Sequence, residues 1–287
     1  MKKTIISLVL CLLMAAPALC ETSVWIAQTD SSVTYIGGTI HFLRETDLPL
    51  PPEFDKAYAE SEVLVFETDL TQLNSPAFEP ALTANATYTD GRTLDSVLSN
   101  EAYIKLEEYC TENSIPVADI NQFKPWMIMM MFMGMEMQKR GIFQEGVDAF
   151  YYNKAMADLK SVEKLETVIE QIEVITTMGD GNESEFIIYS IDDLIKLDEL
   201  FDKLVAAWKT GDMEGLGDMF VNDVKREFPK LYKSLFVDRN NKWVPKIERF
   251  LADPKTEFVL VGTGHLVGED GVITQLIKLG YKVEKFK

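Results

Sequence analysis

The chain has 287 residues, of which 46 are acidic and 28 are basic, so its formal net charge at pH 7 is −18. Such an acidic chain is not expected to bind nucleic acids or anionic lipid surfaces, because both would repel it. Its length suffices for one large domain with its own core.

Residues 1–20 have the pattern of a cleaved export signal. Lys2 and Lys3 form a basic start, residues 5–13 are apolar, and small residues precede Cys20. The bulky Leu19 before Cys20 argues against a lipid anchor at that cysteine. We therefore predict an exported chain, periplasmic or secreted, with one domain over residues 21–287 and no stable membrane insertion after cleavage. Cleavage after Cys20 or after Ala18 is compatible with the pattern. Cleavage after Cys20 leaves only Cys110, which we expect to be a packed thiol outside any disulfide.

The two ends of the chain carry matching patterns. Residues 33–37 form a β-branched run that leads into Gly-Thr-Ile-His at 38–41. A helix opened by two prolines and a strand over residues 63–66 follow. Near the other end, a strand over 257–261 leads into Gly-Thr-Gly-His at 262–265, then a helix over 271–279 and a strand over 281–286. The pattern predicts an α/β fold with two β-α-β half-repeats, each carrying a Gly-x-x-His loop, that face one another across a cleft.

Between the half-repeats, roughly over residues 92–253, the apolar spacing predicts a large helical insertion. One segment of it, residues 125–137, holds seven of the 13 methionines and has almost no polar side. A helix that is apolar all round is either buried or lines an apolar groove. Core packing is the simpler interpretation, and a copper(I) site is a further alternative. As a substrate groove, the segment would present Trp126, Met127, Met130 and Met131.

The chain has only two histidines, His41 and His265, and each follows a predicted buried strand. Ligand sites of open α/β sheets gather at such strand ends, and imidazole is both a common metal ligand and a general base. Glu67 ends the strand after the first histidine loop, so it is expected at the same edge of the sheet. The three side chains could hold a divalent metal, with Glu67 as a ligand or as the base that activates water. Asp69 lies two residues further on and could support them.

Arg239 and Asn240 form a second candidate pair. An arginine and an amide can hold a carboxylate or stabilise an oxyanion. Taken alone, the pair is also typical of a surface turn.

These residues together resemble the TraB/GumN family, whose animal relatives are the Tiki metalloproteases. The resemblance covers nearly all of residues 21–287 and rests on the order and spacing of several short motifs. They are Gly-Thr-Ile-His at 38–41, Leu-Pro at 50–51, Val-Phe-Glu-Thr-Asp at 65–69, Lys-Pro-Trp at 124–126, Gly-Val-Asp at 146–148, Leu-Glu-Thr at 165–167, Trp208 with Gly-Asp at 211–212, Arg-Asn at 239–240, Val-Gly-Thr-Gly-His-Leu at 261–266 and Gly-Tyr-x-Val at 280–283.

The resemblance implies the fold of erythromycin esterase and of the haem-binding ChaN proteins, and metal-dependent peptide cleavage with manganese or cobalt. It also implies which residues matter. His41, Glu67 and His265 match essential positions, and Arg239 and Asn240 match supporting ones. Asp148 and Glu166 also match family positions, where they could either orient a histidine or satisfy helix ends.

Three functions are compatible with the sequence. The first is an exported hydrolase, a peptidase that uses manganese, cobalt or zinc held by His41, His265 and Glu67 and acts on a peptide or protein substrate. The second is a protein that binds haem or another apolar ligand, with one histidine as an axial ligand. The third is a peptide-binding module without catalytic activity. The sequence does not determine the metal, the substrate or the oligomeric state.

Overall fold

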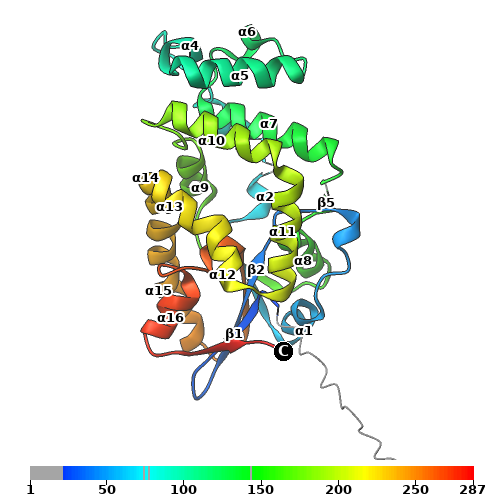
Figure 1. Ribbon diagram of the computed structural model, residues 1–287. Helices are drawn as coiled ribbons and strands as arrows, with labels where there is room; N and C mark the ends of the chain where they lie inside the picture. The colour runs from blue at the N-terminus through cyan, green and yellow to red at the C-terminus, as the bar shows by residue number, and fades with distance from the viewer. Residues whose placement is uncertain (1–21, 74, 77, 143) are drawn as a thin grey trace, which may run out of the picture.

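The computed structural model describes residues 22–73, 75–76, 78–142 and 144–287, so the predicted signal at residues 1–20 lies outside the described residues. The chain has a mixed α/β architecture around one six-stranded sheet (Figure 1). The strands of this sheet, in chain order, are β1 Val24–Gln28, β2 Val33–Thr39, β4 Val63–Phe66, β6 Ser161–Lys164, β7 Glu257–Gly262 and β8 Lys282–Lys285. A separate two-stranded sheet pairs β3 (Phe42–Leu43) with β5 (Gln144–Glu145).

The strand order across the large sheet is β6-β4-β7-β2-β1-β8. β7 lies between β2 and β4 and pairs with both in parallel, and β6 pairs with β4 in parallel. β1 runs antiparallel to β2 and to β8. The carboxyl ends of β2, β4 and β7 therefore emerge together at one edge of the sheet, although these strands lie far apart in the sequence.

Both faces of the sheet are covered by helices. Successive strand residues point to opposite faces, and in the central strands the residues on both faces are apolar. In β7, Phe258 and Leu260 pack on one side, while Val259 and Val261 pack on the other. The first face is covered by α1 (Pro52–Glu60), α8 (Val147–Ala157) and α11 (Leu197–Thr210), and the second by α15 (Asp238–Ala252) and α16 (Val272–Lys278). The sheet is thus buried between two helical layers, which is why its central strands are almost wholly apolar.

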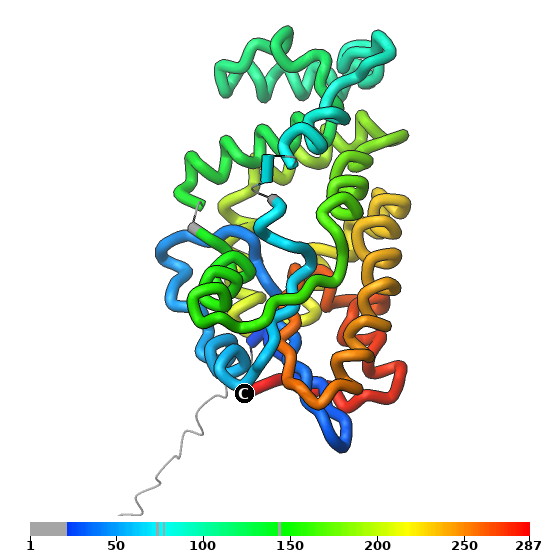
Figure 2. The backbone as a smooth tube through the Cα atoms, turned by 180° about the vertical axis from the view of Figure 1, so that it is seen from behind, coloured from blue at the N-terminus to red at the C-terminus, as the bar shows by residue number. Residues whose placement is uncertain are grey.

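A helical lobe stands beyond one end of this three-layered body, and Figures 1 and 2 show it from opposite sides. Its helices are α4 Leu94–Val97, α5 Asn100–Glu112, α6 Val117–Ile120, α7 Pro125–Lys139 and α10 Glu183–Ile195. They share a third hydrophobic cluster that includes Leu106, Phe132 and Ile187. Cys110 is fully buried in it, and burial raises the pKa of its thiol to about 11, as expected for a packed thiol.

The remaining helical elements connect the sheet, the covering layers and the lobe. They are α2 Leu70–Leu73, α3 Phe78–Thr83, α9 Val168–Ile175, α12 Met213–Gly217, α13 Asp223–Glu227, α14 Pro229–Tyr232 and the short η1 Glu45–Asp47, η2 Asp218–Asn222, η3 Lys233–Val237 and η4 Thr263–His265. Within the described parts of the chain, no helix is both long and apolar enough to cross a bilayer.

The α/β class predicted from the sequence is confirmed, while the interpretation as two half-repeats that face across a cleft stays a prediction. The part of the chain between residues 92 and 253, predicted to be a helical insertion, differs from that prediction in that it also supplies β5 and β6. Residues 117–139 form two helices, α6 and α7, because Pro125 has no N–H to continue a helix and begins a new one instead.

Candidate functional site

The candidate site begins where three neighbouring strands end. His41 follows β2 by two residues, Glu67 comes directly after β4, and His265 closes η4 just beyond β7. Because β7 lies between β2 and β4, the three loops emerge side by side at the carboxyl edge of the sheet. Ligands of open α/β sheets bind at this edge.

The three side chains converge on the space above Gly262. A Cβ atom added at Gly262 would lie 3.1 Å from Oε1 of Glu67, 3.7 Å from Cδ2 of His265 and 3.8 Å from Nε2 of His41. The absence of a side chain at this glycine therefore keeps a small open space among all three groups. The structure brings together the two histidines and the glutamate that the sequence singled out.

His41 is oriented by Asp148. Its Nδ1 lies 3.2 Å from Oδ2 of Asp148, at the start of α8, and its Nε2 has no hydrogen-bond partner among the residues that the structure describes. The attraction of Asp148 raises the pKa of His41 to about 9, so the imidazole is protonated at neutral pH, and its side chain is 57% exposed to solvent. Gly146 makes this pairing possible. A Cβ there would lie 2.2 Å from the carbonyl oxygen of Ile40, so only glycine lets α8 approach the histidine loop so closely.

Glu67 is buried and ionised. Its Oε1 accepts a hydrogen bond from the backbone N–H of Gly262 at 2.7 Å, and its Oε2 accepts from Nη2 of Arg239 at 2.7 Å and from Nε2 of Gln171 at 3.2 Å. Burial raises the pKa of a carboxyl group, but here the charges of Arg239 and of the protonated His41, together with the Gly262 N–H, outweigh it and lower the pKa of Glu67 to about 2.

Arg239 is buried below the site and uses all its hydrogen-bond donors inside the protein. A guanidinium has five N–H groups. Two of them bind Glu166, from Nε at 3.1 Å and from Nη2 at 2.7 Å, and a third binds Glu67. The remaining two, both on Nη1, point to Nε2 of His265 at 2.7 Å and to the carbonyl oxygen of Leu235 at 3.3 Å. Arg239 therefore has no donor left for a substrate carboxylate or an oxyanion.

Asn240 is used in the same way. Its Nδ2 donates to the backbone oxygens of His265 at 3.2 Å and Asp270 at 2.9 Å, and its Oδ1 lies 2.7 Å from Nδ1 of His265. Burial lowers the pKa of His265 to about 3, helped by the positive charge of Arg239, so this imidazole is neutral. The two histidines thus differ in charge, although their local sequences match.

The donor atoms as arranged do not fit a metal site with three protein ligands. Nε2 of His265 and Oε2 of Glu67 already accept hydrogen bonds from Arg239, whose positive charge lies where it would oppose a second cation. Of the predicted ligands, only Nε2 of His41 and a lone pair on Oε1 of Glu67 stay available. In the described parts of the chain, no group of three or more His, Cys, Asp or Glu side chains is arranged to hold a metal ion.

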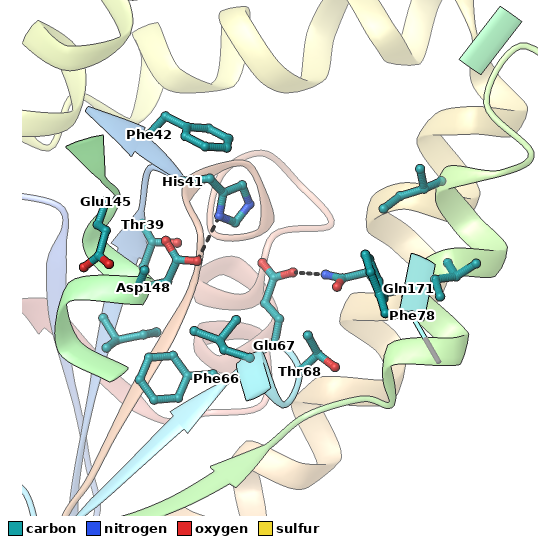
Figure 3. Close-up of a pocket in the computed structure, with 16 residues that line it drawn as sticks. Thr39, His41, Phe42, Phe66, Glu67, Thr68, Phe78, Glu145, Asp148 and Gln171 are labelled. Carbon is teal, nitrogen blue, oxygen red and sulfur yellow. Dashed lines mark hydrogen bonds and ion pairs between the residues drawn. The ribbon is translucent and has the colours of Figure 1, made fainter. Parts of the chain in front are cut away.

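A cavity of about 560 Å³ opens beside His41 and Glu67 (Figure 3). Its walls are mainly apolar and come from the strands β2, β3, β4, β5 and β7 and the helices α2, α3, α8 and α9. Two polar atoms at this cavity are buried without a hydrogen-bond partner, Oγ1 of Thr68 and Oδ1 of Asp148. Buried polar atoms are normally paired, so these two mark places where a bound molecule could supply the missing contacts.

Comparison with known families places the chain. The model of the TraB/PrgY/gumN family matches residues 23–285, which is nearly the whole chain. The chain belongs to the TraB/PrgY/gumN family. The comparisons with curated proteins and with solved structures returned no match.

In this TraB/PrgY/gumN protein, Asp69 lies outside the cavity that His41 and Glu67 share. Its Oδ1 accepts from the N–H of Thr71 at 3.1 Å and from the Thr71 hydroxyl at 2.6 Å, and its Oδ2 from Gln72 at 2.9 Å. The side chain therefore stabilises the start of α2 and borders a neighbouring cavity.

The methionine-rich helix α7 contributes no residue to the lining of the cavity. Trp126 is buried in the helical lobe, whereas Met130 is 49% exposed. None of the predicted groove residues, Trp126, Met127, Met130 and Met131, is among the residues that line the cavity beside His41. The described apolar walls come from other segments, including Phe66, Ile172 and Ile175.

Sequence analysis missed four polar residues that line the cavity, Thr39, Thr68, Glu145 and Gln171. Gln171 lies on α9, and no local motif distinguishes it from a solvent-facing helix residue. Thr68 lies between Glu67 and Asp69, and its position directly after a buried strand was the available signal.

Proposed function

We propose that this chain is a hydrolase of the TraB/PrgY/gumN family that cleaves a peptide bond in the cavity beside His41 and Glu67. The observation that carries the proposal is that the free Nε2 of His41 and the carboxylate of Glu67 share the space above Gly262. Figure 3 shows the two side chains at the same cavity. Two titratable groups whose surroundings move their pKa values apart are a typical acid–base pair. Here the pKa of His41 is raised to about 9 and that of Glu67 is lowered to about 2.

The chemistry follows from these protonation states. A water molecule held by Glu67 attacks the carbonyl carbon of the substrate and gives a proton to the carboxylate. His41 donates its Nε2 proton to the nitrogen of the leaving amine as the carbon–nitrogen bond breaks. The products are a carboxylic acid and an amine, and proton exchange with solvent restores Glu67 and His41. Asp148 keeps His41 charged, while Gln171 and Arg239 fix the carboxylate of Glu67.

A peptide is the substrate class that the cavity supports best. Its mainly apolar walls suit a large side chain, and the unpaired hydroxyl of Thr68 offers one hydrogen bond to a peptide group. Export of the chain, and its location in the periplasm or outside the cell, remain part of the proposal. N-terminal sequencing of the protein recovered from its natural compartment checks this part.

Whether activity depends on manganese, cobalt or zinc is tested separately from whether the chain cleaves peptides. If His41 were a metal ligand, activity would fall as the pH drops toward the usual imidazole pKa of about 6.5, because protons compete with the metal. If His41 is the proton donor, activity persists there and falls above about pH 9. The pH profile, measured with chelator and with each metal added singly, distinguishes these two cases.

The test of the function is an assay on a library of unstructured peptides. We expect cleavage by the natural chain and at least a hundredfold loss of kcat/KM in His41→Asn and in Glu67→Gln. Glu170→Gln, a change at the start of α9 that leaves the cavity lining intact, is the matched control. No cleavage by the natural chain with chelator or with any added metal would refute the proposal.

A second candidate function is binding without turnover. The free Nε2 of His41 in a mainly apolar cavity also suits an axial ligand of haem or a contact with another apolar molecule. An absorbance scan with added haem tests this. A shifted Soret band that is lost in His41→Asn, with no peptide cleavage, would favour the binding function.

A further inference from the structure

His265 and Arg239 lie next to the proposed acid–base pair but have no part in the proton transfers. Both side chains are buried, with exposed fractions of 4% and 6%. The ring of Trp243 packs on both, 4.4 Å from the centroid of the His265 ring and 4.6 Å from the guanidinium carbon of Arg239. A buried imidazole enclosed in this way must have a definite tautomer, because each ring nitrogen has one hydrogen-bond partner. Oε1 of Glu67 also lies 4.0 Å from Nε2, which is beyond hydrogen-bond distance.

The partner of Nδ1 fixes the proton on that nitrogen. Nδ2 of Asn240 donates to two backbone carbonyl oxygens, those of His265 and Asp270, and this fixes the orientation of the amide. Oδ1 of Asn240 must then be the atom that faces Nδ1 of His265 at 2.7 Å. An amide oxygen only accepts hydrogen bonds, so Nδ1 carries the proton.

The partner of Nε2 gives the same answer independently. Nη1 of Arg239 lies 2.7 Å from Nε2 of His265, and a guanidinium can only donate. Nε2 is therefore the unprotonated nitrogen, and its lone pair is already occupied by Arg239. The nitrogen that would have to bind a metal is thus the one that holds the arginine.

We infer that His265 is a positioning residue that holds Arg239 against Glu67, and that it is not a metal ligand. The acceptor at Nε2 and the two oxygens of Glu166 together fix the plane of the guanidinium. In that plane, Nη2 meets Oε2 of Glu67 at 2.7 Å and leaves Oε1 toward the open space above Gly262. The histidines of the two Gly-Thr-x-His motifs therefore have different roles. His41 reaches the cavity, whereas His265 orients the carboxylate of Glu67 through Arg239.

The inference concerns the site of the proposed function, but its main test requires no turnover. Because the chain has only two histidines, two-bond ¹H–¹⁵N spectra of histidine-labelled protein show two imidazoles. The His41→Asn variant assigns them. We expect His265 to show the neutral Nδ1–H tautomer at pH 7, and addition of zinc chloride to leave its signals unchanged. An Nε2–H tautomer, or a zinc-induced shift of Nε2 of His265, would overturn the inference, whereas zinc that shifts only His41 or neither ring supports it.

Two variants of His265 give a second measurement. In His265→Gln, the side-chain oxygen can still accept from Arg239, so we expect kcat within about tenfold of the natural chain. His265→Ala removes the acceptor and should lower kcat by about a hundredfold with little change in KM, because His265 does not line the substrate cavity. Equal losses in the two variants, both folded by circular dichroism, would contradict the positioning role. If the natural chain cleaves no peptide, the proposed function fails while the spectra still decide this inference.

Discussion

Glu67→Gln changes the charge at the centre of the site while it keeps the shape of the side chain. The carboxylate offers an acceptor to the Gly262 N–H with one oxygen and to Arg239 with the other. The glutamine amide has only one oxygen, so one of these two donors must face an NH₂ group instead. We expect a loss of stability as well as a loss of activity.

The magnitude follows from the pKa of Glu67. A fall from the ordinary value of 4.5 to about 2 corresponds to about 3 kcal/mol of stability at pH 7. Because the folded-state pKa is lowered, this contribution is fully present above about pH 4.5 and is lost as the pH falls toward 2. At pH 3 it should have decreased to about 1 kcal/mol. Arg239 keeps its two bonds to Glu166 in the variant, so 3 kcal/mol is an upper value.

Urea denaturation at pH 7 and pH 3 measures this difference. The matched control is Glu166→Gln, which alters the other carboxylate on Arg239. Glu166→Gln likewise leaves one Arg239 donor facing an NH₂ group, but burial raises the pKa of Glu166, so removing its charge offsets part of that loss, and we expect a smaller loss of stability than in Glu67→Gln. If Glu67→Gln is no less stable than the natural chain at pH 7, or if the difference does not narrow at pH 3, then the reasoning about the Arg239 contact is wrong.

Three further predictions concern the cavity. The pH profile of kcat/KM should be flat from about pH 4 to 8 and fall above about pH 9 as His41 loses its proton. In Asp148→Asn, this fall in activity should begin at a lower pH, toward the usual imidazole pKa of about 6.5. If the fall does not move in the variant, His41 is not its origin. Gly146→Ala should cost about 1–3 kcal/mol in urea denaturation, because the new Cβ meets the rigid backbone of Ile40, and a neutral result would mean that α8 shifts freely. Thr68→Val should leave the free protein equally or more stable, since the change removes an unpaired hydroxyl. The same variant should raise KM several-fold. An unchanged KM would show that the hydroxyl does not contact the substrate.

The central sheet was predictable because its strands are buried on both faces. Runs such as Phe258–Val261 and Val63–Phe66 are continuous and apolar, and each meets helices on two sides. β6 was missed for the opposite reason. It lies at the edge of the sheet and its residues Ser161–Lys164 are mostly exposed and polar, so no apolar period marks it.

The composition of the methionine-rich helix predicts that it is buried, but it does not predict which part of the protein the helix packs against. A helix without a polar face was expected to be buried or to line a groove, and α7 does pack in the core of the helical lobe through Ile128, Met129 and Phe132. Which cavity a helix lines depends on tertiary placement, and the sequence carries no signal that sets this lobe apart from the sheet edge. The apolar walls beside His41 come instead from short segments around the strand ends.

The two histidines show most clearly why residue identity could be predicted while residue role could not. Both occupy a Gly-Thr-x-His loop after a parallel strand, so any argument from the local sequence treats them alike. Their partners differ. His41 meets Asp148, which only accepts hydrogen bonds and carries a negative charge, so the imidazole is protonated with a free N–H toward the cavity. His265 meets Arg239, which only donates and carries a positive charge, so its imidazole is neutral and its lone pair is occupied. The role of each histidine is thus decided by whether the tertiary structure supplies an acceptor or a donor, and those partners lie 107 and 26 residues away in the sequence.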